Sequence, residues 1–157
     1  GLVEARRWDI YKKPFNSEAH FKDYILKTSS NLLWVAAQTL GVADKKVVEE
    51  FGYGVGLANF FVATPDLLKR GRLPLLRYEN EFIRSLAEDG ILKIRAARLQ
   101  RAKVSSHAGA ALLSGWKALR VLKQVARYPN RVRNGLKKDI KTIENISLIF
   151  RSLTGQW

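Results

Sequence analysis

The chain has 157 residues, of which 46% are hydrophobic, and a formal net charge of +14 at pH 7. This length and composition suit a single folded domain, residues 1–157, and exclude a disordered chain. Because cysteine is absent, disulfides, thiolate metal sites and cysteine nucleophiles are excluded, and the two histidines lie far apart without a partner at ligand spacing. No apolar run approaches the roughly 20 residues that span a bilayer, so no transmembrane segment is expected.

The first predicted helix covers residues 19–40. Ser17, which comes three positions after Pro14, is a suitable N-cap for it. Gly41 is placed to end the helix. The apolar residues of this segment recur at helical spacing and are Phe21, Tyr24, Ile25, Leu32, Val35 and Ala36.

The second predicted helix starts near Asp44 and contains three glycines at alternate positions, Gly52, Gly54 and Gly56. A phosphate-binding loop is also glycine-rich, but here neither a following Gly-Lys-Ser/Thr nor a preceding strand is present. We therefore expect these glycines to let neighbouring helices approach closely. The helix should stop before Pro65, because proline disfavours a helical residue in front of it.

A basic loop over residues 69–74 is predicted next, with its turn at Gly71. The third helical region covers residues 79–104, and Gly90 is a point at which it could be interrupted. Its predicted apolar side consists of Phe82, Leu86, Leu92, Ala96 and Leu99.

Two further helices are predicted, over residues 108–126 and 136–153, separated by a break at Tyr128-Pro129-Asn130. The residues of the last helix expected to face inward are Ile140, Ile143, Ile146 and either Ile149 or Phe150. We assign Trp34 and Trp116 to the core, whereas Trp157 is free to dock on a partner. The whole chain is therefore predicted to be all-α.

The positive charge is concentrated in the basic C-terminal half, residues 91–157. Residues 1–90 carry 13 basic and 12 acidic residues, a net +1, whereas residues 91–157 carry 15 and 2, a net +13. A solvated basic face is the simple explanation, but residues 91–138 contain no acidic residue at all. So long a basic run favours a polyanionic partner: RNA, an anionic membrane or acidic protein subunits. The residues expected to contact it are Arg95, Arg98, Arg101, Lys103, Lys117, Arg120, Lys123, Arg127, Arg131, Arg133, Lys137 and Lys138.

Three stretches carry a resemblance to a known family. The first is residues 3–10 (VEARRWDI), followed by 21–24 and 28–33 (TSSNLL), and the second is residues 52–65 with the following basic loop. The third, a looser one, is residues 94–103, then Arg127-Tyr128-Pro129 and a last helix that ends in an aromatic residue. They resemble the squalene/phytoene synthase family, and most closely its mitochondrial branch, the assembly factor of respiratory complex I. The resemblance implies the C-terminal part of an isoprenoid synthase fold, without the N-terminal helices that would carry the first aspartate-rich motif.

The metal-binding pattern of that family is missing from this chain. Family synthases join prenyl diphosphates with Mg²⁺ held by Asp-x-x-x-Asp pairs, a spacing that puts two carboxylates on one helix face. No two acidic residues of this chain are four positions apart, and the place of the second motif falls on residues 63–67, where Asp66 stands alone. We therefore expect a pseudoenzyme with no catalytic residue, no metal and no cofactor.

Three functions stay open. The first is a non-catalytic scaffold or accessory subunit of a large mitochondrial assembly, respiratory complex I above all, which binds protein subunits in the matrix or at the matrix face of the inner membrane. The second is a mitochondrial ribosomal protein that contacts rRNA through two basic stripes. One stripe is Arg95, Arg98 and Arg101, which recur every three residues, and the other is Lys117, Arg120, Lys123 and Arg127. The third is a lipid- or prenyl-binding pseudoenzyme with a vestigial pocket of Trp34, Phe60 and Phe61, although collapse of these residues into a filled core is favoured.

Overall fold

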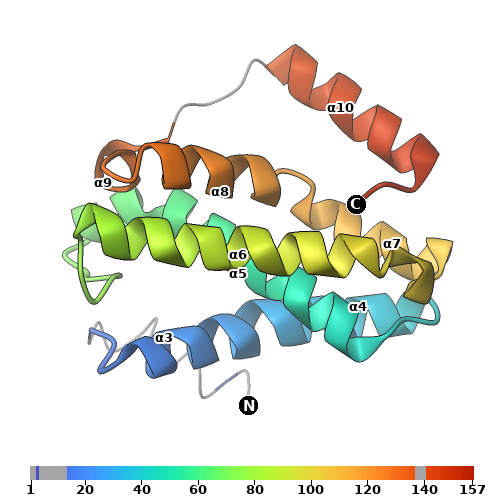
Figure 1. Cartoon of the computed structure of the whole chain (residues 1–157), viewed down its shortest axis with the longest axis horizontal. Coiled ribbons are helices and arrows are strands. Elements are labelled where there is room, and N and C mark those ends of the chain that lie inside the picture. Colours follow the sequence, from blue (N-terminus) through green and yellow to red (C-terminus); the bar gives the residue numbers. More distant parts are fainter. Residues whose placement is uncertain (1–2, 4–13, 137–140) are drawn as a thin grey trace.

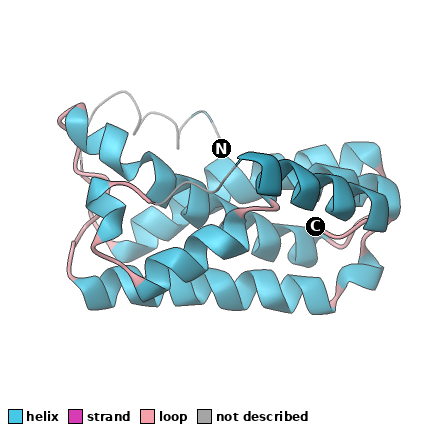
Figure 2. Cartoon of the chain, turned by 90° about the horizontal axis from the view of Figure 1, so that it is seen from above, coloured by secondary structure: helices cyan, strands magenta, loops and turns pink. Residues whose placement is uncertain are grey.

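The computed structural model describes Val3, residues 14–136 and residues 141–157, with side chains in the last segment from Ser147 onward. The described part of the chain is helical and contains no strand, which confirms the all-α prediction (Figures 1 and 2). The elements in chain order are α3 (Glu18–Ile25), η1 (Leu26–Ser30), α4 (Asn31–Leu40), α5 (Lys45–Lys69), α6 (Asn80–Leu99), η2 (Arg101–Lys103), α7 (Ser106–Leu112), η3 (Leu113–Gly115), α8 (Ala118–Arg127), α9 (Arg131–Asn134) and α10 (Lys141–Thr154). None of these helices is long and apolar enough to cross a membrane.

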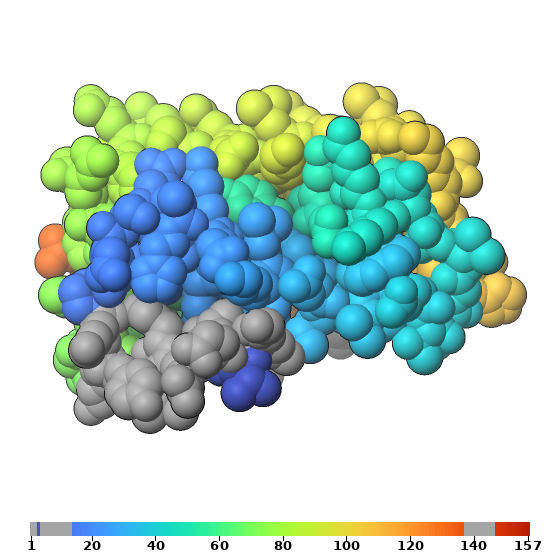
Figure 3. All heavy atoms as spheres, turned by 90° about the horizontal axis from the view of Figure 1, so that it is seen from below, coloured from blue at the N-terminus to red at the C-terminus, as the bar shows by residue number. Residues whose placement is uncertain are grey.

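Helix α5 is the centre of the fold. Every residue from 51 to 58 is buried, as expected for a helix that is covered on all sides. Helices α3 and α4 lie along one side of the α5–α6 pair and α8 lies along the other (Figure 1). Seen from below, the surface shows α3, α4 and the start of α5, with α6 along its upper edge (Figure 3). Helices α8 and α10 lie on the other side of the α5–α6 pair (Figure 1).

The first predicted helix is present, with an irregularity in its middle. The Ser17 hydroxyl accepts a hydrogen bond from the His20 N–H at 3.1 Å, which confirms the N-cap. The turn η1 is a π turn, because the Asn31 N–H bonds to the carbonyl of Leu26, five residues back. Helix α4 ends at Gly41, where a Cβ would lie 2.6 Å from Ser105 Oγ, so the glycine allows a close approach of α7.

Helix α5 starts next to Asp44 as predicted, and the Asp44 carboxylate caps it by accepting a hydrogen bond from the Val47 N–H at 3.0 Å. The predicted stop before Pro65 is wrong, because α5 continues to Lys69 with Pro65 inside it. A proline inside a helix costs about 3 kcal/mol. Phe61 and Thr64, on the turn before it, are fully buried, and this packing outweighs the local preference.

The three alternate glycines of α5 allow close helix contacts, as predicted. A Cβ on Gly52 would lie 2.8 Å from the Ser30 Cα, and one on Gly56 would lie 2.7 Å from the Ser29 Cβ. Gly54 points the other way, toward α6, where a Cβ would lie 2.9 Å from the carbonyl oxygen of Gly90. Because residues two apart lie on nearly opposite sides of a helix, the pattern brings η1 and α6 close to opposite faces of α5.

Helix α6 is not interrupted at Gly90, and its buried face differs from the predicted one. Leu86 is buried as expected, but Leu92 and Leu99 are 63% and 89% exposed, and Phe82 is only half-buried. The buried residues of this helix are Ile83, Leu86, Ala87, Gly90, Ile91, Ile94 and Ala97. The buried face contains small residues because α6 packs so closely on α5.

The helix predicted over residues 108–126 is broken into α7, η3 and α8. The break occurs at Gly115, where a Cβ would lie 2.3 Å from Val55 Cγ2. Trp34 and Trp116, assigned to the core from sequence, are half-buried. Trp157 is 3% exposed and packs edge-on against Phe51, with ring centroids 4.8 Å apart, so it docks within its own chain.

Helix α10 is present, but its orientation differs from the prediction. Ile149 and Phe150, one of which was expected to face inward, are 58% and 60% exposed. Ile140 and the side chains of Ile143 and Ile146 lie outside the described residues.

Candidate functional site

The residues predicted to contact an anionic partner lie on several elements. Arg95 and Arg98 are on α6, Arg101 and Lys103 on η2, Lys117 immediately before α8, Arg120, Lys123 and Arg127 on α8, and Arg131 and Arg133 on α9. Lys137 and Lys138 lie outside the described residues. Most of the described side chains in this set are exposed, whereas Arg98, Arg101 and Arg131 are half-buried.

Helix α8 presents its basic residues to solvent. It buries Ala118, Leu122 and Val125 and exposes Lys123 and Arg127 on the other side. Within the described part of the chain, no acidic side chain lies within ion-pair distance of Lys123 or Arg127. Lys123 and Arg127 are therefore not neutralised by any acidic side chain of the described structure.

An arginine–tyrosine cluster, made of Tyr78, Arg127, Tyr128, Arg131 and Arg133, lies where α8 passes into α9. The guanidinium carbons of Arg127 and Arg131 lie 5.3 and 4.3 Å from the centre of the Tyr128 ring, and that of Arg133 lies 5.1 Å from the Tyr78 ring. A guanidinium over an aromatic ring is attracted to the ring and can still donate its N–H groups to oxygen acceptors. The cluster thus offers pre-positioned donors to carboxylates or phosphates.

Sequence analysis identified the arginines of this cluster but not the tyrosines. Tyr128 appeared there only as part of a helix break, and Tyr78 belongs to a loop that meets α9 only in three dimensions. Basic residues flanking an aromatic residue within a few positions, as in Arg127-Tyr128, are the signal that could have found half of the cluster.

The predicted stripe of Arg95, Arg98 and Arg101 is not a uniform surface. Arg95 is exposed, but the Arg101 guanidinium turns toward α10 and donates to the backbone carbonyls of Thr154 and Gly155. Nε and Nη2 of Arg98 are buried and have no hydrogen-bond partner among the described residues. Arg98 of α6 and Arg101 of η2 therefore both lie at the contact with α10.

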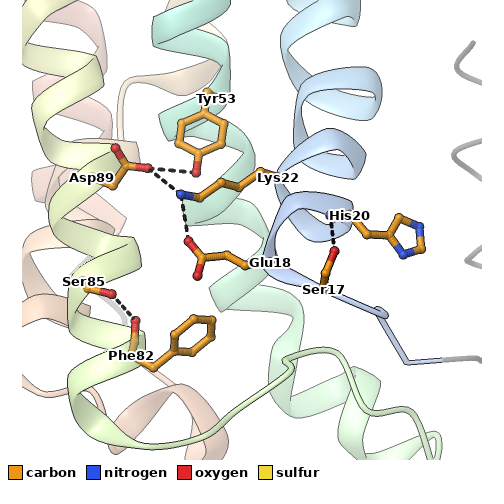
Figure 4. Close-up of polar contacts among 8 residues, drawn as sticks. All are labelled: Ser17, Glu18, His20, Lys22, Tyr53, Phe82, Ser85 and Asp89. Carbon is orange, nitrogen blue, oxygen red and sulfur yellow. Dashed lines mark hydrogen bonds and ion pairs between the residues drawn. The ribbon is translucent and has the colours of Figure 1, made fainter.

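A polar network joins α3, α5 and α6 (Figure 4). The Tyr53 hydroxyl donates to the Asp89 carboxylate at 3.0 Å, and the Lys22 amine lies 2.8 Å from Glu18 and 3.9 Å from Asp89. Burial, reinforced by the Asp89 charge, raises the pKa of Tyr53 far above its ordinary value. The phenol stays protonated and is a poor base or nucleophile. The network therefore acts as a cross-link between helices. Sequence analysis did not predict this network.

Stability should fall at alkaline pH because of this network. Tyr53 keeps its proton in the folded state, whereas in the unfolded chain it loses it near pH 10, so raising the pH above about 10 favours unfolding. The raised pKa of Lys22, caused mainly by its hydrogen bond to Glu18, acts in the same direction.

Tyr53→Phe should lower the free energy of unfolding at pH 7 by about 1 kcal/mol and reduce the loss of Tm between pH 9 and about 11. Thermal melts followed by circular dichroism across this range provide the measurement. Tyr128→Phe, which removes a hydroxyl from a 38% exposed ring, is the control and should follow the wild type. An unchanged alkaline loss in Tyr53→Phe would show that this phenol is not responsible.

An apolar groove of about 690 Å³ runs between η1, α4 and α5. Its walls include Leu32, Leu33 and Ala36 of α4 and Asn59, Phe60 and Ala63 of α5. Of the three residues predicted to form a vestigial pocket, only Phe60 lines this groove. Phe61 is fully buried in the core and Trp34 lies outside the lining, so the structure does not bring the three together in one pocket.

No arrangement suited to metal binding occurs in the described part of the chain, where no three His, Asp or Glu side chains gather closely enough to hold an ion. Asp66, at the place of the second aspartate motif, forms an exposed ion pair with Lys69 at 3.4 Å. Comparison with protein-family models and with curated proteins finds no match to this chain.

Proposed function

We propose that this chain is a non-catalytic scaffold or accessory subunit of a large mitochondrial assembly, with respiratory complex I as the leading candidate. The observation that carries the proposal is the basic surface of α8 together with the arginine–tyrosine cluster. Lys123 and Arg127 have no acidic neighbour in the described structure, and three guanidiniums lie over tyrosine rings. A free domain would bear the mutual repulsion of these charges, which an acidic partner would relieve.

The choice of complex I rests on sequence resemblance. Residues 3–10 and 52–65 are similar to the assembly-factor branch of the squalene/phytoene synthase family, and we extend to this chain that branch's location at the matrix face of the inner membrane. The lone Asp66 supports a fold retained for binding after the synthase metal site was lost. The same resemblance makes the C-terminal part of an isoprenoid synthase fold our proposal for the ancestry of these helices.

The second candidate is a mitochondrial ribosomal protein. The guanidinium edges of the arginine–tyrosine cluster suit phosphate oxygens as well as carboxylates, and phosphate contacts need no sequence-reading motif. Acidic protein and RNA partners both give salt-dependent binding, so salt alone does not separate the two candidates.

Affinity purification of the chain from mitochondria, with and without RNase, separates them. The scaffold proposal expects subunits of complex I, or of another inner-membrane complex, to co-purify in equal amounts with and without RNase. Ribosomal proteins that disappear after RNase treatment would instead establish the rRNA contact and overturn the scaffold proposal.

A further inference from the structure

Trp157 fastens the end of α10 to the core, although the helix itself lies at the outer edge of the molecule (Figure 1). Its indole is 3% exposed and packs edge-on against Phe51, and a Cβ on Gly109 would lie 3.3 Å from the ring. Among residues 147–157, whose side chains the structure describes, Trp157 is the only buried one, and Phe150 is 60% exposed. The apolar burial that holds this end of α10 in place therefore comes mainly from Trp157.

The turn after α10 is built around Gly155. Its φ is +61°, a left-handed conformation, and the Gln156 N–H donates to the Arg151 carbonyl at 2.9 Å, which closes the end of the helix. The carbonyl oxygens of Thr154 and Gly155 accept hydrogen bonds from the Arg101 guanidinium. Because carbonyls at a helix C-terminus carry partial negative charge, they occupy Arg101 as an anion would.

The docked position of α10 also has an electrostatic cost. Nε and Nη2 of Arg98 are buried and have no hydrogen-bond partner among the described residues. After burial, the like charges of Arg151 and Arg101 lower the pKa of Arg98. No acidic side chain of the described structure forms an ion pair with any of these three arginines. Displacing α10 would take the charge of Arg151 away and free Arg101 for another acceptor.

We infer that the end of α10 is an autoinhibitory cover for two arginines of the α6–η2 stripe, Arg98 and Arg101. An acidic protein partner competes with the helix: its carboxylates replace the carbonyl oxygens that Arg101 now contacts, and the end of α10 leaves the body of the molecule. A carboxylate is the stronger acceptor for a guanidinium, and the exchange also moves Arg151 away. The inference rests on the proposed function, from which it takes the acidic partner, and it adds a conformational switch to the basic surface.

Hydrogen–deuterium exchange of the purified full chain tests the displacement, with a polyglutamate peptide as the acidic probe. When the probe is bound, amides of residues 147–157 should exchange at least about tenfold faster, whereas those of residues 51–58, in the centre of α5, should stay protected. Binding of polyglutamate with unchanged exchange in residues 147–157 would show that α10 stays in place and would overturn the inference. Displacement by poly(U) but not by polyglutamate would overturn the choice of an acidic protein.

Gly155→Val should loosen the docked end without changing the core, because valine is strained at a φ of +61° and the position is exposed. The variant should bind polyglutamate at least about fivefold more tightly than the wild type, since the binding-competent state is then more populated. Adding Arg98→Gln and Arg101→Gln should cancel this gain. Gly71→Val is the matched control, because Gly71 is also exposed, has a φ of +72° and lies in the loop after α5. It should leave the affinity unchanged.

Equal affinity of Gly155→Val and the wild type, or a gain that persists without the two arginines, would contradict the cover. Failure of both proteins to bind polyglutamate would contradict it as well. Circular dichroism should show the same helicity for the wild type and the control. Affinity purification identifies the partner whether or not α10 moves, so failure of the switch leaves the scaffold proposal standing. Failure of the scaffold proposal in that purification leaves the exchange result with polyglutamate unchanged.

Discussion

Replacing Gly54 with valine is expected to lower the free energy of unfolding by roughly 3 kcal/mol or more. A Cβ at this position would lie 2.5 Å from Ile94 Cγ1 and 2.9 Å from the carbonyl oxygen of Gly90. A side chain such as Ile94 can rotate away, but the Gly90 carbonyl belongs to the backbone of α6 and can move only with its helix. The two central helices would therefore have to separate, which opens the core that the rest of the chain packs around.

Urea denaturation followed by circular dichroism measures this loss, which is a large share of the roughly 5–15 kcal/mol that stabilises a typical domain. Ala63→Val is the control, because it places the same side chain at an exposed position of the same helix. It should cost well under 1 kcal/mol, the difference in helix propensity. A loss at Gly54 no larger than the loss at Ala63 would mean that the contact of α5 with α6 is not tight, because replacing glycine with valine does not lower helix propensity.

Charge reversal on α8 should weaken partner binding at least about tenfold while leaving the fold intact. Lys123→Glu combined with Arg127→Glu replaces two exposed residues that have no acidic neighbour in the described structure. The double variant therefore breaks no ion pair of the described structure, and its effect is expected on partner binding. It also places a negative charge beside Arg131, which disturbs the arginine–tyrosine cluster. The measurement is quantitative affinity purification, repeated at several salt concentrations.

The control for charge is Lys45→Glu combined with Lys46→Glu, at the start of α5. It changes the net charge by the same amount, and both side chains are exposed. Partner recovery should stay close to that of the wild type. If both double variants lose the partner equally, attraction depends on overall charge alone and the surface of α8 has no special role.

Helix starts could be predicted from sequence because their signals are local. Ser17 and Asp44 each bond to a backbone N–H three residues ahead, and this geometry depends on nothing outside the first turn. The close approach at Gly54 was also predictable in kind, since glycine inside a helix needs a compensating contact. The helix that makes this contact, α6, could not be predicted, because it is distant in the sequence.

The errors have a common cause in tertiary packing. Pro65 lies inside α5 because the turn before it is buried, and Leu92 and Leu99 are exposed because small residues suit the tight contact of α6 with α5. The basic residues of the candidate surface could be listed from sequence. The sequence does not predict which of these basic residues face solvent, as on α8, and which turn inward, as Arg101 does. The orientation of Arg101 depends on where α10 packs.

The π turn η1 allows the helical segment to hold one extra residue. It holds one residue more than an ordinary turn between α3 and α4, and each residue of a helix turns the following part by about 100°. Deleting a single residue between Leu26 and Ser30 would leave an unbroken α-helix with good local geometry. Because the deletion removes the extra residue that the π turn accommodates, α4 would keep its rotation and Leu33 and Ala37 would stay in the core. The close contacts of Ser29 and Ser30 with the glycines of α5 would be rearranged. A one-residue deletion in η1 should therefore be tolerated better than one inside α4, where it would rotate the rest of the helix by about 100°.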